Sequence, residues 1–164
     1  DLLFPSMIWI VPEGHIVLFL SIHPEYVSAM AQGTKTVELR RQVPRCKPDD
    51  WIAIYSSSPV MRLEAVARIT SIMVSTPKSV WEQWRNKCGV SKLVFDNYFL
   101  DSRRAVAIEL NSYRSLPTPI SLVELRSRWH GFHPPQGFRY LTPEYLASVP
   151  EITCATEQKP RKAA

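Results

Sequence analysis

A glycine, a lysine, a glutamate and an arginine occur at close spacing in the segment GTKTVELR, residues 33–40. Glu38 and Arg40 stand two positions apart, so on a β-strand their side chains share one face. Arg40 offers a planar fork of donors that suits a phosphate or a base edge, and Glu38 can accept from an exocyclic amine. Lys35 could contact phosphate as a point charge or, when desolvated, act as a nucleophile or base. The segment therefore predicts a site for a polar, anionic ligand.

A plainer interpretation of the same segment stays open. Lysine, glutamate and arginine on one strand often form only a cross-strand ion-pair network, which contributes about 0–1 kcal/mol when it is exposed. The alternation also places Lys35 on the apolar face with Val37 and Leu39, where a lysine is costly unless it is paired or lies at the strand mouth. Gly33, just before the strand, would allow another part of the backbone to approach closely.

Two neighbouring segments could complete such a site. The run IAIYSSSPV predicts a strand that ends in a hydroxyl-rich loop, so Tyr55 could stack on a base while Ser56, Ser57 and Ser58 donate hydrogen bonds. The turn after the strand is basic and contains Arg41, Arg45 and Lys47. A solvated turn and a track for nucleic-acid phosphates explain these three residues equally well.

Composition places the chain among globular domains. Its 164 residues suffice for one domain, and an apolar fraction of 45% with 21% charged residues allows a buried core and excludes a wholly disordered chain. The formal net charge of +5 favours polyanionic partners, nucleic acid first, although such a charge is common in ordinary domains.

Cofactor and metal signals are weak. The three cysteines have no metal-ligand spacing and are expected to be free thiols, which predicts a cytoplasmic protein. His130 and His133 lack a third ligand nearby, so we expect no metal. No dinucleotide-binding or phosphate-loop glycine pattern is present, so we expect no cofactor.

The two ends of the chain differ from its middle. Residues 1–15 are apolar but interrupted by proline and glycine, with neither a basic leader nor an unbroken apolar span, so a signal peptide and a membrane helix are not expected. We expect a peripheral extension over residues 1–15, a domain over 16–148 and a flexible basic tail over 149–164.

Hydrophobic periodicity predicts alternating strands and short helices. Strands are expected at 16–22, 34–41, 50–60, 62–74 and 103–113, and helices at 23–33, 77–89, 91–100 and within 116–129. The serine loop predicts a hairpin between the third and fourth strands, and the tryptophans at 81, 84 and 129 are expected in the core. The order favours a small mixed barrel over a doubly wound parallel sheet.

The segment GTKTVELR resembles the G-x-K-x-x-E-x-R signature of the ASCH domain superfamily, with Gly33, Lys35, Glu38 and Arg40 at the signature positions. The stretches LSIHPEYV, IAIYSSSPV and PPQGFRYL are similar to the same group, in the same order. The resemblance implies an α+β fold, a PUA-like mixed β-barrel decorated with short helices, with a cleft and with nucleic acid, RNA more than DNA, as the partner. The amidohydrolase members carry threonine where this chain has Glu38.

Three functions follow as hypotheses. The first is an RNA-binding and regulatory domain whose cleft holds a nucleotide or base. The second is a hydrolase that acts on a modified nucleoside or on RNA, with Lys35 and Glu38 as catalytic residues. The third is a protein-interaction domain with a vestigial cleft.

Overall fold

The computed structural model describes residues 16–157, so the expectation for residues 1–15 lies outside the described part. No helix within the described residues is both long and apolar enough to cross a membrane. One six-stranded sheet, in the order β2-β5-β4-β3-β1-β6, forms the framework. The strands are β1 (Val17–Ile22), β2 (Val37–Arg40), β3 (Trp51–Ser56), β4 (Arg62–Ser75), β5 (Ala105–Ser121) and β6 (Phe138–Tyr140).

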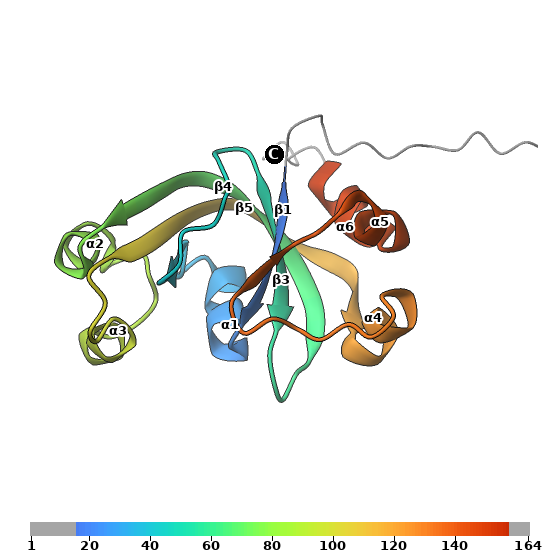
Figure 1. Ribbon diagram of the computed structural model, residues 1–164, viewed down its shortest axis with the longest axis horizontal. Helices are drawn as coiled ribbons and strands as arrows, with labels where there is room; N and C mark the ends of the chain where they lie inside the picture. The colour runs from blue at the N-terminus through green and yellow to red at the C-terminus, as the bar shows by residue number, and fades with distance from the viewer. Residues whose placement is uncertain (1–15, 158–164) are drawn as a thin grey trace, which may run out of the picture.

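The sheet is mixed and strongly curved. β1 and β3 run parallel, whereas the other neighbouring pairs are antiparallel. Figure 1 shows β4 and β5 as two long ribbons that arch from α2, above α1, to the middle of the molecule, where they meet β1 and β3. The register of β4 against β5 shifts at several points, and such bulges bend and twist a strand. The α+β, PUA-like fold with a curled sheet and short helices confirms the predicted fold class.

Short helices decorate both sides of this sheet. They are α1 (Pro24–Gln32), α2 (Pro77–Trp84), α3 (Lys92–Tyr98), α4 (Leu122–Arg128), α5 (Pro143–Ser148) and α6 (Pro150–Glu157). Side-chain hydroxyls cap four of these helices by accepting a backbone N–H of the first turn, and they belong to Thr76, Ser91, Ser121 and Thr142. Gly33 ends α1 in the left-handed conformation, with φ of 80°, which favours glycine.

The core has separate parts on the two faces of the sheet because strand side chains alternate. On β1, Val17 and Phe19 pack with α4, α5 and α6, while Leu18, Leu20 and Ile22 pack with α1. A third cluster joins α2 and α3 to β2 and β5. Figure 1 shows α2 and α3 at one end of the β4–β5 arch, and α4, α5 and α6 at the other side of the molecule. The three tryptophans predicted for the core belong to these clusters.

The two edges of the sheet come together and are joined by a side chain. β2 and β6 stand at opposite ends of the strand order. Even so, Arg40 of β2 donates from Nη1 to the carbonyl of Gly137, next to β6, and from Nη2 to the carbonyl of Ser21 in β1, at 3.1 and 3.0 Å. We call this contact between 40–45 and 136–140 the seam. The barrel is thus closed here by side chains rather than by a strand ladder.

Several predicted boundaries are wrong. β2 begins only at Val37, so Lys35 precedes the strand and does not belong to its apolar face. β5 extends to Ser121, beyond the predicted end at 113. α6 occupies Pro150–Glu157 and buries Ile152 and Ala155, where a flexible tail was expected from 149. The hairpin of β3 and β4 through the serine loop is confirmed.

Candidate functional site

A pocket of about 310 Å³ opens at the seam. Its volume lies at the lower end of the range for small-molecule sites. Glu38, Leu39 and Arg40 of β2 form one side, and the C-terminal end of β1 with α1 forms another. The remaining wall comes from α3, the loop before it and the loop before β6. The full lining is Ser21, Ile22, His23, Tyr26, Lys35, Glu38, Leu39, Arg40, Val90, Val94, Phe95, Tyr98 and Gln136.

Lys35 lies under this pocket with its amine already bonded. Its side chain is only 1% exposed. Nζ donates to the carbonyls of Val37 and Cys88, at 2.8 and 2.6 Å, and stands 3.7 Å from Glu38 Oε1. The ring of Tyr26 lies 5.3 Å from the same nitrogen. Because carbonyls and a carboxylate already surround the ammonium, its main action is to hold the α2–α3 loop against β2 and to orient Glu38.

The close approach of that loop depends on Gly89. Its φ is +69°, a conformation that L side chains rarely adopt, and a Cβ built there would stand 2.9 Å from Cβ of Lys35. The backbone N–H groups of Thr36 and Val37 both donate to the carbonyl of Lys87. The chain therefore wraps closely around the Lys35 stem, and only glycine fits at position 89 without a shift.

Glu38 stands between two cations. Its Oε1 accepts from the backbone N–H of Leu39 at 2.9 Å, and its Oε2 lies 3.6 Å from Arg40 Nη2. The side chain of Glu38 is 8% exposed and that of Arg40 12%. Two cations and one carboxylate leave one excess positive charge at low exposure, where Coulomb interactions are screened less than in open solvent. The pocket floor accordingly favours an anionic or electron-rich ligand group.

Two polar atoms beside this floor have no partner within residues 16–157. They are Oγ of Ser21 and Nε of Arg40, and both are buried. A buried polar atom without a hydrogen bond costs about 1–3 kcal/mol, so native proteins rarely leave one unsatisfied. Since Ser21 and Arg40 both line the pocket, a ligand group or water there can satisfy these atoms.

The opposite wall of the pocket is aromatic and apolar. Phe95 and Tyr98 come from α3, and Tyr26 comes from α1. Burial raises the pKa of Tyr26, and the negative charges of Glu25 and Glu38 raise it further. Its phenol therefore stays protonated at neutral pH and can donate a hydrogen bond or a proton. A charged floor and aromatic walls together match the two properties of a nucleotide, a polar edge and a flat ring.

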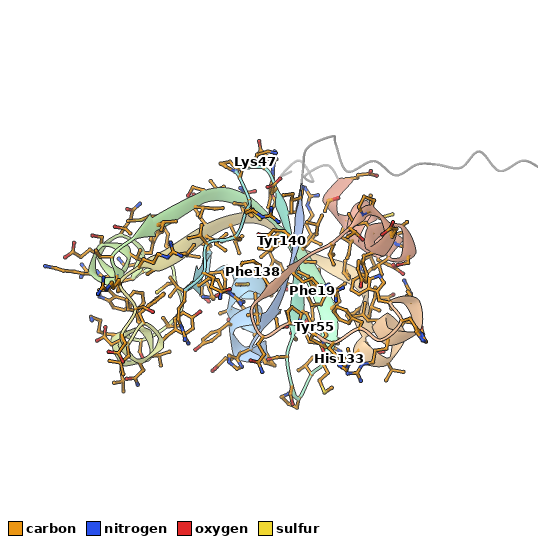
Figure 2. All side chains as sticks on the ribbon, in the orientation of Figure 1. Phe19, Lys47, Tyr55, His133, Phe138 and Tyr140 are labelled. Atoms are coloured by element: carbon orange, nitrogen blue, oxygen red, sulfur yellow. The ribbon has the colours of Figure 1, made fainter. Side chains whose placement is uncertain are left out.

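The structure brings only part of the predicted site together. Lys35, Glu38 and Arg40 line one pocket, but Tyr55 does not. Tyr55 points to the other face of the sheet and packs with Phe19, at 5.6 Å between ring centroids, as Figure 2 shows. Ile54, the preceding residue of β3, points to the opposite face and packs on the α1 side. The expectation that Tyr55 stacks on a ligand in this pocket is therefore wrong in its geometry.

The serine loop and Gly33 lie near the pocket without lining it. Ser56 is 1% exposed and pairs with Ile22, and the N–H of Ser57 donates to the carbonyl of Ile22. Ser58 is exposed in the turn that follows. Gly33 ends α1 and sets the direction from which the chain reaches Lys35. These residues support the walls of the pocket through Ile22 and α1.

The predicted basic turn spreads along the seam. The guanidinium of Arg41 lies 4.5 Å from the ring centroid of Tyr98, a wall residue of the pocket. Arg45 instead stacks on Tyr140, whose hydroxyl accepts from the Arg45 backbone N–H. Lys47 bonds through its backbone N–H to Asp50, which also binds Ile16 at the start of β1. Figure 2 places Lys47 at the end of the sheet away from α1. Only Arg41 therefore adjoins the pocket.

Sequence reasoning missed most of the pocket walls. The predicted helices at 23–33 and 91–100 include Tyr26, Val94 and Tyr98, but their periodicity does not distinguish a pocket wall from the core. Ser21 and Gln136 belong to the stretches LSIHPEYV and PPQGFRYL, which resemble the family, but nothing within either stretch indicates that the two residues line one pocket. Within residues 16–157, no group of three or more histidine, cysteine, aspartate or glutamate side chains could hold a metal ion.

The fold and this pocket define a PUA-like domain, and comparison with known proteins specifies the family. The ASCH domain model matches residues 20–134, so the chain belongs to the ASCH domain family. A curated relative, the ASCH domain-containing ribonuclease of Zymomonas mobilis, is 28% identical over 138 residues, which cover 84% of this chain and 93% of that protein.

Solved structures agree with this assignment. The crystal structure of ASCH from Zymomonas mobilis has a TM-score of 0.77 and 27% identity, with 81% of this chain and 92% of that chain covered. Crystal structures of two of its variants, a serine-to-alanine and a tyrosine-to-phenylalanine, match equally well. A hypothetical protein from Leishmania major has a TM-score of 0.53 at 11% identity, with 89% and 99% of the two chains covered, and shows the fold alone.

Proposed function

We propose that the protein binds single-stranded RNA and holds one nucleotide in the seam pocket. One observation carries this proposal: a buried group of two cations and one carboxylate faces aromatic residues across a pocket of about 310 Å³. Sequence-specific recognition of RNA typically uses an unstacked base that lies on an aromatic ring and bonds through its edge. The Zymomonas relative that is named a ribonuclease supports RNA over other anions.

The polar atoms of the floor suit a base edge better than a bare phosphate. Glu38 Oε2 lies 3.6 Å from Arg40 Nη2 and accepts no hydrogen bond from the described residues. It can therefore accept one from a ring N–H or an exocyclic amine of a base. Ser21 Oγ can donate or accept, and Arg40 Nε can only donate. An edge that carries both a donor and an acceptor would satisfy all three atoms.

A salt titration of RNA binding tests the proposal. We expect a labelled single-stranded RNA oligomer to bind at low salt, with the logarithm of affinity falling linearly against the logarithm of salt concentration. A DNA oligomer of the same sequence should bind more weakly, because it lacks the 2′-hydroxyl. Absence of RNA binding at low salt would exclude this function and favour a protein-interaction domain.

RNA cleavage through a 2′,3′-cyclic phosphate, the first step of hydrolysis by many ribonucleases, is a second candidate, and the name of the Zymomonas relative favours it. In the reaction that this pocket could support, the 2′-oxygen forms a bond to phosphorus while the bond from phosphorus to the 5′-oxygen breaks. Glu38 would take the proton of the 2′-hydroxyl, and the protonated Tyr26 would supply one to the leaving oxygen. Lys35 would act by orienting Glu38, since its amine is already bonded to two carbonyls.

Turnover distinguishes this candidate from simple binding. If Glu38 carries a proton, Glu38→Gln should lower the cleavage rate by roughly two to four decades while ground-state binding is nearly retained. If the unsubstituted protein binds RNA without cleaving it, and Glu38→Gln weakens this binding, RNA binding alone remains as the function.

A further inference from the structure

Arg41 is held at the mouth of the pocket in a way that suggests a second contact with the ligand. Its guanidinium lies over Tyr98, 4.5 Å from the ring centroid, while the edge of Tyr98 packs on Phe99 at an interplanar angle of 74°. A free arginine side chain populates many rotamers, and stacking on a ring restricts them before any ligand arrives. The side chain is therefore preorganised.

The donors of this guanidinium are unused within residues 16–157. Arg41 is exposed, its guanidinium stacks on Tyr98, and it makes no hydrogen bond or ion pair with a side chain of the described residues. The neighbouring Arg40 differs, because both of its Nη atoms donate to backbone carbonyls of the seam. Arg40 thus forms part of the pocket, whereas Arg41 presents its planar fork of donors to solvent beside the pocket wall.

We infer that Arg41 binds a phosphate that adjoins the nucleotide in the pocket, so the ligand is a polynucleotide strand rather than a free nucleoside; this rests on the proposed RNA-binding function. A planar fork of N–H donors matches two oxygens of a phosphodiester. Tyr98 connects the two contacts, since it lines the pocket and carries Arg41. A base in the pocket and a phosphate on Arg41 therefore fix consecutive parts of one strand.

Arg45 provides a matched control. It is also exposed and also stacks on a tyrosine, with its guanidinium 5.2 Å from the ring centroid of Tyr140. Tyr140 pairs with Leu18, near the start of β1, whereas the pocket is built at the opposite end of that strand. The hydrogen bond of Arg45 to Tyr140 uses the backbone N–H, so a side-chain substitution leaves it intact.

The experiment measures RNA affinity against salt for Arg41→Gln, Arg45→Gln and the unsubstituted protein. The probe is a labelled RNA hexamer pool of random sequence, used both unmodified and with 2′-fluoro sugars that prevent attack by the 2′-hydroxyl. We expect Arg41→Gln to weaken binding about tenfold at low salt, the scale of a charge-assisted hydrogen bond. The slope of the salt dependence should fall by about 0.7, the value for one phosphate contact of a single strand.

The control should change affinity by less than about twofold and leave the salt slope unchanged. Arg41→Lys should retain the slope, since it retains the charge, but lose part of the affinity with the stacked fork. Equal losses from Arg41→Gln and Arg45→Gln, or no loss from Arg41→Gln, would overturn the inference while RNA binding by the unsubstituted protein stands. If the unsubstituted protein binds neither pool, the proposed function and the inference both fail.

Discussion

Both faces of the sheet carry aromatic residues, but on one face they form a packed core and on the other they line a pocket. On one face, five aromatic rings pack against one another under α4 and α5, with centroid distances of 5.0–6.0 Å, and they belong to Phe19, Tyr55, Trp129, Phe132 and Tyr145. The indole N–H of Trp129 is fully used there by the carbonyl of Tyr145 and the hydroxyl of Ser148. On the other face, Tyr26 of α1 and Phe95 and Tyr98 of α3 line a pocket.

This difference shows what distinguishes a core from a site in this protein. Aromatic content does not distinguish the core from the site, because both faces of the sheet carry aromatic residues. Two polar atoms beside the pocket differ from the bonded indole N–H of Trp129: Ser21 Oγ and Arg40 Nε are buried and without a partner in the described part of the chain, as is Arg68 Nε in β4 away from the pocket. Buried atoms of that kind are costly, and proteins retain them where a ligand or ordered water completes the bonding.

The largest effect is expected from removing the cation under the pocket. Lys35→Ala leaves the carboxylate of Glu38 with one fewer partner and the carbonyls of Val37 and Cys88 without a donor. Breaking a buried ion pair on one side costs about 3–5 kcal/mol, so the free energy of unfolding in urea should fall by that amount. Lys78→Ala, on an exposed first turn of α2, is the control and should change it by less than about 0.5 kcal/mol. A Lys35 variant as stable as this control would mean that the buried group does not hold the α2–α3 loop.

A smaller loss is expected at Gly89, and here the comparison can be made between two glycines. Gly89 and Gly131 have similar φ, +69° and +71°, but an added Cβ meets Lys35 only at Gly89 and nothing within 4 Å at Gly131. Gly131→Ala should cost about 1–3 kcal/mol from backbone strain alone. Gly89→Ala should cost more in the same unfolding experiment and should also weaken RNA binding, since Lys35 must move. Equal costs, with binding unchanged, would show that the Lys35 stem yields easily.

At Glu38 the expected effect is on the ligand rather than on the fold. Glu38→Gln keeps the shape and one acceptor oxygen but removes the charge. RNA binding should weaken by about 1–3 kcal/mol, the scale of a hydrogen bond to a charged group, with little change in the salt slope because no phosphate contact is lost. Affinity, cleavage and thermal melting of this variant are measured together. Affinity unchanged from the unsubstituted protein would contradict a direct role for Glu38 in binding.

Local sequence signals predicted most of the strands and helices and the three charged residues of the floor. Periodicity and capping residues act over a few positions, and the spacing of Lys35, Glu38 and Arg40 is itself local. The seam is not local: Arg40 meets Ser21 and Gly137 because the sheet curls, and this curvature depends on bulges in β4 and β5 that no short pattern shows. Ser21 and Gln136 lie in stretches that resemble the family, but their meeting at one pocket could not be predicted for that reason.

Tyr55 illustrates the remaining error, and the smallest prediction follows from it. The sequence predicts its ring in the site because the strand ends in a hydroxyl-rich loop. The face to which a strand side chain points depends on its position in the alternation, whatever follows the strand. In the structure Ala53 and Tyr55 face the side covered by α4, α5 and α6, and Ile52 and Ile54 face α1.

Tyr55→Phe keeps the ring that packs on Phe19 and removes only the hydroxyl. RNA affinity and its salt slope should therefore equal those of the unsubstituted protein, and the thermal midpoint should move by no more than about 2–4 °C, the equivalent of 1 kcal/mol in a domain of this size. Tyr26→Phe, the matched substitution on the pocket wall, should weaken binding if its phenol donates to the ligand. A loss of affinity for Tyr55→Phe as large as that for Tyr26→Phe would mean that the closed face also contacts RNA, and the distinction between the two faces would not hold.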